Sequence, residues 1–353
     1  MRRQLYLSLM FISFLMTSYG SVAEQQHKVY HLYGQTMGNK YAISWSAAPT
    51  SAKEVYQLHL KVEARLEKIN ASMSTWRSDS EINAVNEASA RHPLKLSAEL
   101  HQVIREAMRL GRLTGGALDI TIAPLIDLWG FGPYGLPGRV PTHEEIAEVR
   151  AHTGLDSITL DQDELTKTRE RTRLDLSAIA KGYGVDAMGQ LLQESGIHHF
   201  LVEIGGEVMA RGTRADGRPW TVGVDNPRPA SYSDTTRIAL NNQAVATSGD
   251  YRRYFESQGT RFSHIIDPKT GRAVQTQVVS ATVIAPSCTT ADGLATAAMV
   301  MGVKDTLALA ERQQLAVMLI EDHFGQIRVH RSQAFNQLLR PEAETNRASV
   351  PEL

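Results

Sequence analysis

The sequence predicts an α+β fold in which mixed or antiparallel β-sheets are flanked by helices. The chain has 353 residues, of which 42% are hydrophobic and 21% charged, an ordinary globular composition that allows a large core. Strand-like runs cluster in the C-terminal half and are joined by tight turns, which favours this class over a regular alternation of strands and helices. No internal repeat, low-complexity tract or polar linker divides the chain, so we expect one domain over residues 24–341 and a polar tail over 342–353.

The first 23 residues have the organisation of a secretory signal peptide. Arg2 and Arg3 precede an apolar run over residues 5–16, and small residues follow at Ser21 and Ala23. The run is shorter than the ~20 residues that comfortably span a membrane. We therefore expect an exported, periplasmic protein without a stable membrane span, the alternative being an uncleaved anchor. No cysteine lies near the cleavage site, so a lipoprotein is not expected.

Charge and cysteine content exclude several classes of protein. The chain carries 37 Lys and Arg against 38 Asp and Glu, a net charge of −1, and loss of Arg2 and Arg3 with the signal peptide makes it −3. A nucleic-acid binder would carry a basic excess. Cys288 is the one cysteine, which excludes an intramolecular disulfide framework and multi-cysteine zinc or iron–sulfur sites.

The N-terminal half of the mature chain begins with a hairpin. Residues 29–34 and 40–45 are predicted strands around a turn that contains Met37. Apolar residues at steps of three and four between positions 55 and 69 predict an amphipathic helix. A second helix is predicted over 97–114 and ends at two glycines. A loop over 130–141 and a short helix opened by the capping box of Thr142 and Glu145 complete this half.

The C-terminal half is richer in strands. Helices are predicted over 179–194, 291–301 and 305–312. Predicted strands cover 158–160, 173–176, 199–204, 220–224, 237–240, 262–266, 278–285 and 315–320.

Two N-terminal segments carry polar residues that packing does not require. In 73–86, small polar residues and Trp76 follow directly on a helix end; the alternative is a connection capped by Ser78 or Asp79. In 115–133, Asp119 lies between apolar residues, where an unpaired carboxylate is unfavourable. Its partner is either a cap or salt bridge in the protein or the polar edge of a ligand.

Segment 175–188 predicts an anion site. A strand ends at Asp175, and the helix that follows presents unpaired N–H groups that suit phosphate. Lys181 and Gly182 would add positive charge and close approach. The pattern G-x-x-x-x-G-K-[ST] is absent, so this segment is not a P-loop.

The last two segments predict a base and a metal ligand set. His264 lies in a strand-like run, where a histidine is usually structural, but beside a phosphate site it becomes a candidate general base. Asp292 and Thr296 are four residues apart and share a helix face. With a backbone carbonyl they form an all-oxygen set that suits Mg²⁺, although Asp292 as an N-cap is an equal alternative from this segment alone.

The combination of motifs resembles the ApbE family of periplasmic FAD:protein FMN transferases. The motifs, in order, are TMG (36–38), MSTWRSDSEI, GGALDITIAPLIDLWGFGP, DLSAIAKGYGVD, LVEIGGE, ATSGDYRRY, SHIIDPKTG and ADGLATA. They cover nearly all of the mature chain and are jointly specific. The resemblance implies an ApbE-like, T-fold-related architecture.

The family also implies the site residues. The metal ligands would be Ala178 through its carbonyl, Asp292 and Thr296, and His264 matches the histidine proposed as catalytic base. Positions that contact FAD map onto Met37, Trp76, Ala117, Leu118, Asp119, Asp175, Lys181 and Ile265. Trp76 stands where many members have tyrosine, and position 181 is acidic in some relatives.

The implied reaction is Mg²⁺-dependent transfer of FMN from FAD to a threonine or serine hydroxyl, with release of AMP. The implied acceptors are subunits of membrane redox complexes. Two alternatives stay open: an FAD pyrophosphatase that releases FMN and AMP, and a non-catalytic flavin-binding protein.

Overall fold

A central antiparallel sheet of eight strands organises the molecule. The structure is a computed structural model that describes residues 28–48, 50–135, 138–224 and 236–339, so the predicted signal peptide and the tail over 342–353 lie outside the described residues. The strand order is β1-β2-β6-β7-β10-β13-β14-β15, and every neighbouring pair is antiparallel. The strands are β1 (Lys28–Thr36), β2 (Asn39–Ala47), β6 (Phe200–Ile204), β7 (Glu207–Arg211), β10 (Ala244–Gly249), β13 (Val278–Ala285), β14 (Ala316–His323) and β15 (Gln326–Arg331). The α+β class predicted from the sequence is confirmed.

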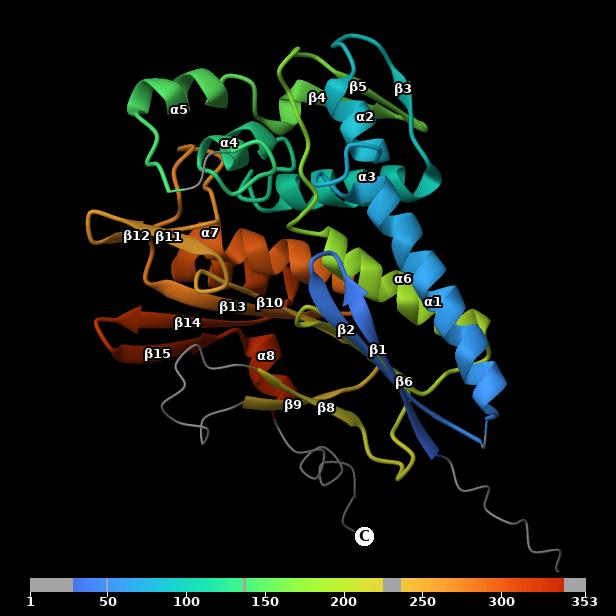
Figure 1. The fold of residues 1–353 in the computed structure, drawn as a ribbon. Helices are drawn as coiled ribbons and strands as arrows, with labels where there is room; N and C mark the ends of the chain where they lie inside the picture. The colour runs from blue at the N-terminus through green and yellow to red at the C-terminus, as the bar shows by residue number, and fades with distance from the viewer. Residues whose placement is uncertain (1–27, 49, 136–137, 225–235, 340–353) are drawn as a thin grey trace, which may run out of the picture.

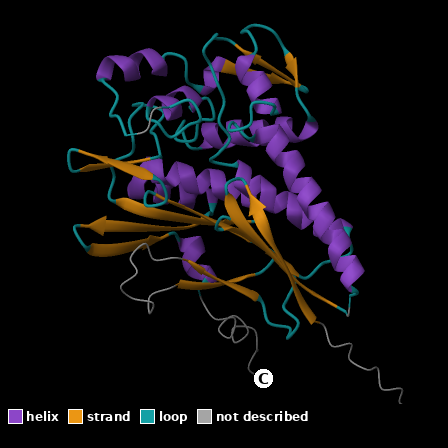
Figure 2. Ribbon diagram, viewed as in Figure 1, coloured by secondary structure: helices purple, strands orange, loops and turns teal. Residues whose placement is uncertain are grey.

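Three long helices cover one face of this sheet (Figures 1 and 2). They are α1 (Ala52–Met73), α6 (Ala180–Glu194) and α7 (Cys288–Gln313). Helix α7 packs on β10 and β13, and α6 packs on β6, β7 and α7. The opposite face is covered by β8 (Trp220–Val224), β9 (Thr236–Leu240) and α8 (Gln333–Leu338), which enclose a second, smaller core. Because β13 is covered on both faces, its residues are buried along nearly the whole strand and not at alternate positions.

A helical lobe stands above the three long helices. Its elements are α2 (Glu81–Glu87), β3 (Leu94–Lys95), α3 (Ala98–Leu113), α4 (Ala123–Leu128), α5 (His143–Arg150), the 3₁₀ turn η1 (Leu155–Ser157), β4 (Ile158–Asp161) and β5 (Glu164–Lys167). Strands β3, β5 and β4 form a small antiparallel sheet. The hairpin of β11 (Tyr254–Ser257) and β12 (Thr260–Ser263) projects beside the lobe (Figure 1).

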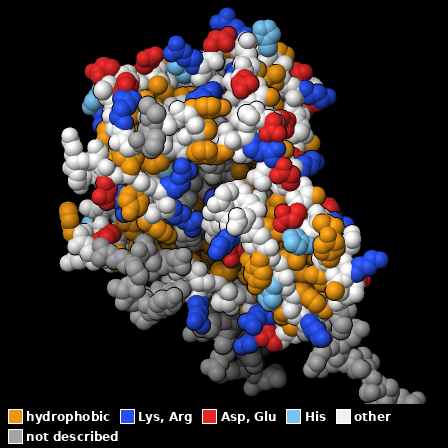
Figure 3. All heavy atoms as spheres, viewed as in Figure 1, with side chains coloured by type: hydrophobic (Ala, Val, Ile, Leu, Met, Phe, Trp, Pro, Cys, Tyr) orange, Lys and Arg blue, Asp and Glu red, His pale blue; other side chains and the backbone are white. Residues whose placement is uncertain are grey.

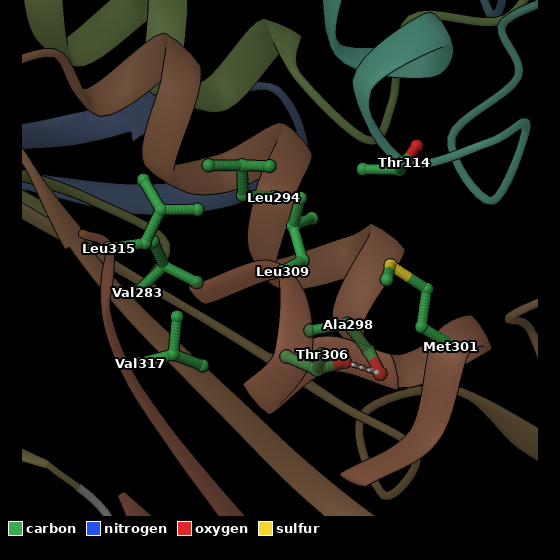
Figure 4. Close-up of a pocket in the computed structure, with 9 residues that line it drawn as sticks. All are labelled: Thr114, Val283, Leu294, Ala298, Met301, Thr306, Leu309, Leu315 and Val317. Atoms are coloured by element: carbon green, nitrogen blue, oxygen red, sulfur yellow. Dashed lines mark hydrogen bonds between the residues drawn. The ribbon is translucent and has the colours of Figure 1, made fainter. Parts of the chain in front are cut away.

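Local sequence signals fix several helix ends. Ser51 caps α1 in a reciprocal capping box with Glu54, and Thr142 and Glu145 form the predicted box at the start of α5. The helices predicted over 291–301 and 305–312 form one element that is broken at Gly302, whose φ of 73° is not helical. At this break the Thr306 hydroxyl donates to the Ala298 carbonyl at 3.3 Å (Figure 4). The cavity beside it measures about 10 Å³ and is too small for a ligand.

Helix α7 is also, by length and composition, the one helix among the described residues that could cross a membrane. Half of its most apolar window is buried inside the protein. Its packing on β10 and β13 accounts for this apolar character, because a helix between a sheet and other helices is apolar on several sides.

Three expectations about local structure were wrong. Residues 173–176 are not a strand: Arg173 forms one isolated bridge with Ile122, and the Asp175 N–H donates to Ile120. The predicted strand over 262–266 is β12, which ends at Ser263, so His264 lies directly after a strand. The N-cap of α2 is Ser80, and neither Ser78 nor Asp79 takes that role. Contacts with residues distant in sequence determine the structure of 173–176, and Ser80 is a neighbouring residue with equal capping propensity.

Candidate active site

The start of α6 meets the first turns of α7 at unusually close range. The Gly182 N–H donates to Asp292 Oδ2 at 2.9 Å. A Cβ at position 182 would lie 2.4 Å from the Cys288 carbonyl oxygen and 2.8 Å from Asp292 Cβ, so only glycine fits between the helices. Asp292 is 2% exposed. Burial raises the pKa of this carboxyl, whereas the charge of Lys181 acts to lower it.

This contact leaves one backbone oxygen open. In a regular helix the Gly182 N–H would bond to the carbonyl of Ala178, but here it is given to Asp292. Among the described residues, no hydrogen bond to the Ala178 carbonyl oxygen is present. An open carbonyl one turn before Gly182 is therefore available as a ligand.

The oxygen atoms around this point fit a small divalent cation. Thr296 follows Asp292 by one turn of α7, and its hydroxyl hydrogen-bonds to Ser248 Oγ on β10 at 3.1 Å. One carboxylate, one hydroxyl and one carbonyl form a hard oxygen set, which suits Mg²⁺ with water and phosphate in its remaining positions. The part of the chain that the structure describes holds no cluster of three or more His, Cys, Asp or Glu side chains that could bind a metal.

Lys181 lies between two buried carboxylates. Its Nζ is 2.7 Å from Glu207 Oε2 and 3.9 Å from Asp292 Oδ1. Burial acts to lower the pKa of Lys181, but the two carboxylates outweigh burial and the pKa is raised. The lysine is therefore a fixed cation at neutral pH.

His264 is held as a neutral base. Its Nδ1 lies 3.0 Å from the Arg253 carbonyl, which can only accept, so Nδ1 carries the proton and Nε2 keeps its lone pair. Burial lowers the pKa of His264 to about 4, and the charges of Arg253, Lys181 and Arg252 act in the same direction. The ring packs edge-on against Phe131, with the centroids 6.3 Å apart. The charges of Lys181 and Arg252 therefore act on both His264 and Asp292.

Trp76 joins this site from the helical lobe. The guanidinium of Arg253 lies 5.8 Å from the centre of its ring, and the side chain is 61% exposed. Its position beside the residue that holds His264 leaves an aromatic face open for stacking. Met37, in the β1–β2 turn, packs over α6, with its Cε 3.0 Å from where a Cβ on Gly184 would lie.

The remaining predicted contact residues are either hydrogen-bonded within the protein or buried in its core. Asp175 accepts from the Ser177 N–H at 2.7 Å and from the Thr75 hydroxyl at 3.4 Å. Asp119 Oδ1 accepts from the N–H and the hydroxyl of Thr121, and burial raises its pKa. This carboxylate thus has a fixed protein partner. Ala117, Leu118 and Ile265 are buried.

The sequence reasoning did not identify three polar residues near the contact between α6 and α7. Glu207 forms the ion pair with Lys181. Arg252 donates to the Gly205 carbonyl at 2.7 Å and so lies on the glycine turn that precedes Glu207. Asp186 accepts from the N–H groups of Cys288 and Thr289 at 2.8 and 2.9 Å and thereby caps α7. Each belongs to a motif quoted above, but no spacing rule identifies its partner.

Lys and Arg side chains gather near the middle of the face shown in Figure 3, between the helical lobe and the sheet. With a chain that is close to neutral overall, such local clusters are what an anionic ligand would meet.

The chain is similar to known proteins over most of its length. The model of the ApbE family matches residues 37–319. The chain is 43% identical over 309 residues to an FAD:protein FMN transferase of Vibrio cholerae, covering 88% of this chain and 92% of that one. It is 41% identical over 306 residues to the protein of that name from Haemophilus influenzae, covering 85% and 88%.

Solved structures give the same result. The flavin transferase ApbE from Vibrio cholerae superposes with a TM-score of 0.82 at 41% identity, covering 88% of this chain and 99% of that one. The apo form of the flavinyl transferase ApbE from Pseudomonas stutzeri gives 0.82 at 38% identity, covering 89% and 98%. The chain belongs to the ApbE family and is an enzyme of the transferase class.

Proposed function

We propose that the enzyme transfers FMN from FAD to a threonine or serine hydroxyl of an acceptor protein, with Mg²⁺ bound, and releases AMP. Relatives named FAD:protein FMN transferase at 41–43% identity support flavin transfer. The observation that carries the proposal is the pairing of a neutral base, His264, with an open oxygen set at Ala178, Asp292 and Thr296.

The residues of the chain account for each step of a phosphoryl transfer. Nε2 of His264 accepts the proton of the acceptor hydroxyl, the hydroxyl oxygen forms a bond to the phosphorus of the FMN half, and the bond from that phosphorus to the AMP phosphate breaks. A general base of this kind contributes ~10²–10⁴-fold to the rate. Ala178, Asp292 and Thr296 would hold Mg²⁺, which would supply charge stabilisation to the diphosphate. Lys181 and Arg252 add fixed positive charge beside it.

FAD would be held by the residues that surround this centre. Trp76 offers an exposed ring for stacking, and Met37 covers the start of α6. The other proposed contacts are Ala117, Leu118, Asp119, Asp175, Lys181 and Ile265.

One experiment separates transfer from its alternatives. The purified protein is mixed with FAD, Mg²⁺ and a candidate acceptor, and flavin fluorescence is read in a denaturing gel. Fluorescence that stays with the acceptor demonstrates the transferase. Free FMN and AMP without labelled acceptor would show that water is the nucleophile and that the protein is an FAD pyrophosphatase. If FAD stays intact, the protein binds flavin without catalysing its cleavage.

We also propose that the enzyme acts in the periplasm on subunits of membrane redox complexes. The signal-peptide pattern of residues 1–23 is the basis for the location, and the acceptors are those that the resemblance to the ApbE family implies. N-terminal sequencing of the protein recovered from the periplasmic fraction tests it: a mature terminus at Glu24 supports export and cleavage, and recovery of the intact chain from the cytoplasm would contradict both.

A further inference from the structure

The ion pairs around Lys181 are asymmetric. The lysine lies on the first turn of α6, Asp292 on α7 and Glu207 at the start of β7. Nζ is in contact with Glu207 at 2.7 Å but stands 3.9 Å from Asp292. Glu207 is 1% exposed, so its charge is not stabilised by bulk water and depends on this partner. The lysine is therefore drawn to the carboxylate that has no proposed role in metal binding.

The position of the ammonium matters because of which Asp292 oxygen it faces. Oδ2 already accepts the Gly182 N–H at 2.9 Å, and Oδ1 is the oxygen that faces Lys181. A lysine in direct contact with Oδ1 would place a compact positive charge where a divalent cation has to bind. Two cations at one carboxylate oxygen repel each other strongly in a buried site.

We infer that Glu207 is a positioning residue that holds Lys181 away from Asp292 and so keeps Asp292 Oδ1 available to the divalent cation. The inference rests on the proposed function in one respect, since it takes Asp292 as a metal ligand. Lys181 then serves as a nearby fixed cation for the diphosphate without competing for the metal.

The test measures cation binding directly, with Mn²⁺ as the probe and FAD absent. Free Mn²⁺ is followed by its EPR signal in titrations of the full chain. Glu207→Gln keeps the size of the side chain but removes the charge, so Lys181 is released toward Asp292. The Coulomb difference between 3.9 Å and direct contact, at an effective dielectric constant of about 20, corresponds to roughly tenfold weaker Mn²⁺ binding.

A double variant, Lys181→Met with Glu207→Gln, separates this mechanism from a direct attraction between the Glu207 charge and the cation. In Lys181→Met no ammonium can move onto Asp292, so Mn²⁺ binds at least as tightly as in the wild type. Adding Glu207→Gln to that background then has less than a twofold effect. Equal weakening by Glu207→Gln in both backgrounds would overturn the inference, because the glutamate would then act only through its own charge.

Glu99→Gln is the matched control. Glu99 on α3 forms ion pairs with Arg65 and Lys68 of α1, each at 2.6 Å. Loss of the Glu99 charge therefore removes comparable ion pairs away from the site and should leave Mn²⁺ binding unchanged. Thermal unfolding of every variant shows whether it is folded. Failure of the wild type to bind Mn²⁺ would refute the metal site of the proposed function and the inference with it. Normal wild-type binding that Glu207→Gln does not alter would refute the inference alone.

Discussion

Substitution of Gly182 by alanine tests whether the close contact between α6 and α7 builds the site. The new Cβ would lie 2.4 Å from the Cys288 carbonyl oxygen, which is backbone and cannot rotate away. The helices must separate by about 1 Å to restore ordinary contact. Overpacking of this kind costs about 1–3 kcal/mol, and a weakened charge-assisted hydrogen bond to Asp292 about 1.5–3 kcal/mol more. The helix propensity of alanine returns about 1 kcal/mol, so we expect a net loss of about 1.5–5 kcal/mol.

Gly184→Ala is the control on the same helix. Its Cβ would approach Met37 Cε at 3.0 Å, which is the flexible end of a side chain, so the change should be close to neutral in stability. Thermal unfolding should place Gly182→Ala about 2–7 °C below Gly184→Ala. Flavin transfer should fall by ~10²-fold in Gly182→Ala, because a shift of about 1 Å misplaces Asp292. Similar melting temperatures and equal transfer rates in the two variants would refute the reasoning.

Four further predictions address individual side chains. His264→Ala should still bind FAD, measured by quenching of flavin fluorescence, while transfer falls by ~10²–10⁴-fold; full activity would remove its role as base. Asp292→Asn should lose transfer and Mg²⁺ dependence together, measured by a Mg²⁺ titration of the rate, and unchanged Mg²⁺-dependent transfer would contradict the metal site. Arg252→Gln should weaken FAD binding about tenfold with a smaller change in the rate at saturation, and the reverse pattern would argue against a role in binding. The free energy of unfolding should fall as the pH drops from 6.5 toward 4, because His264 is protonated at a higher pH in the unfolded chain than in the folded protein. His264 contributes at most about 3 kcal/mol to this fall. A His264→Gln variant, followed by denaturant unfolding at each pH, should lose this contribution to the pH dependence.

Local signals predicted the longer helices and α5, but not the short helices α2, α4 and α8. The capping box of Thr142 and Glu145 and the apolar spacing of α1 are encoded within a few residues, so the sequence alone identifies them. The break at Gly302 also appears in the sequence as two separate helical patterns. These features need no knowledge of the rest of the chain.

Sheet partners were harder to predict, because pairing depends on residues far apart. Strands β7 and β10 form the middle of the sheet, but β7 is short and β10 ends in small polar residues, so neither shows a clear alternating pattern. The loop at Arg173 has the composition of a strand, yet its ladder pairing is limited to one isolated bridge with Ile122. The period of apolar residues and the strand propensity do not distinguish β7 and β10, which are strands, from the loop at Arg173.

The same limit applies to the site. Asp292 and Thr296 share one helix face, so their spacing by itself indicates a joint role. Glu207 reaches Lys181 only because β7 runs beside the start of α6, and nothing in the spacing of the two residues indicates that contact. Arg252 is likewise placed by a backbone carbonyl on the turn between β6 and β7.

The distribution of charge explains how a nearly neutral protein can hold an anionic dinucleotide. Lys181 and Arg252 face two buried carboxylates, Glu207 and Asp292, so without a further cation the positive and negative charges of the cluster balance. A divalent cation at Asp292 would make the net charge positive, and the diphosphate would then meet a positive centre instead of a neutral one. Metal binding should therefore strengthen FAD binding, and by linkage FAD should strengthen metal binding by the same factor. Titrations of FAD with and without Mn²⁺, and of Mn²⁺ with and without FAD, measure the two factors, and independent binding would contradict this electrostatic account.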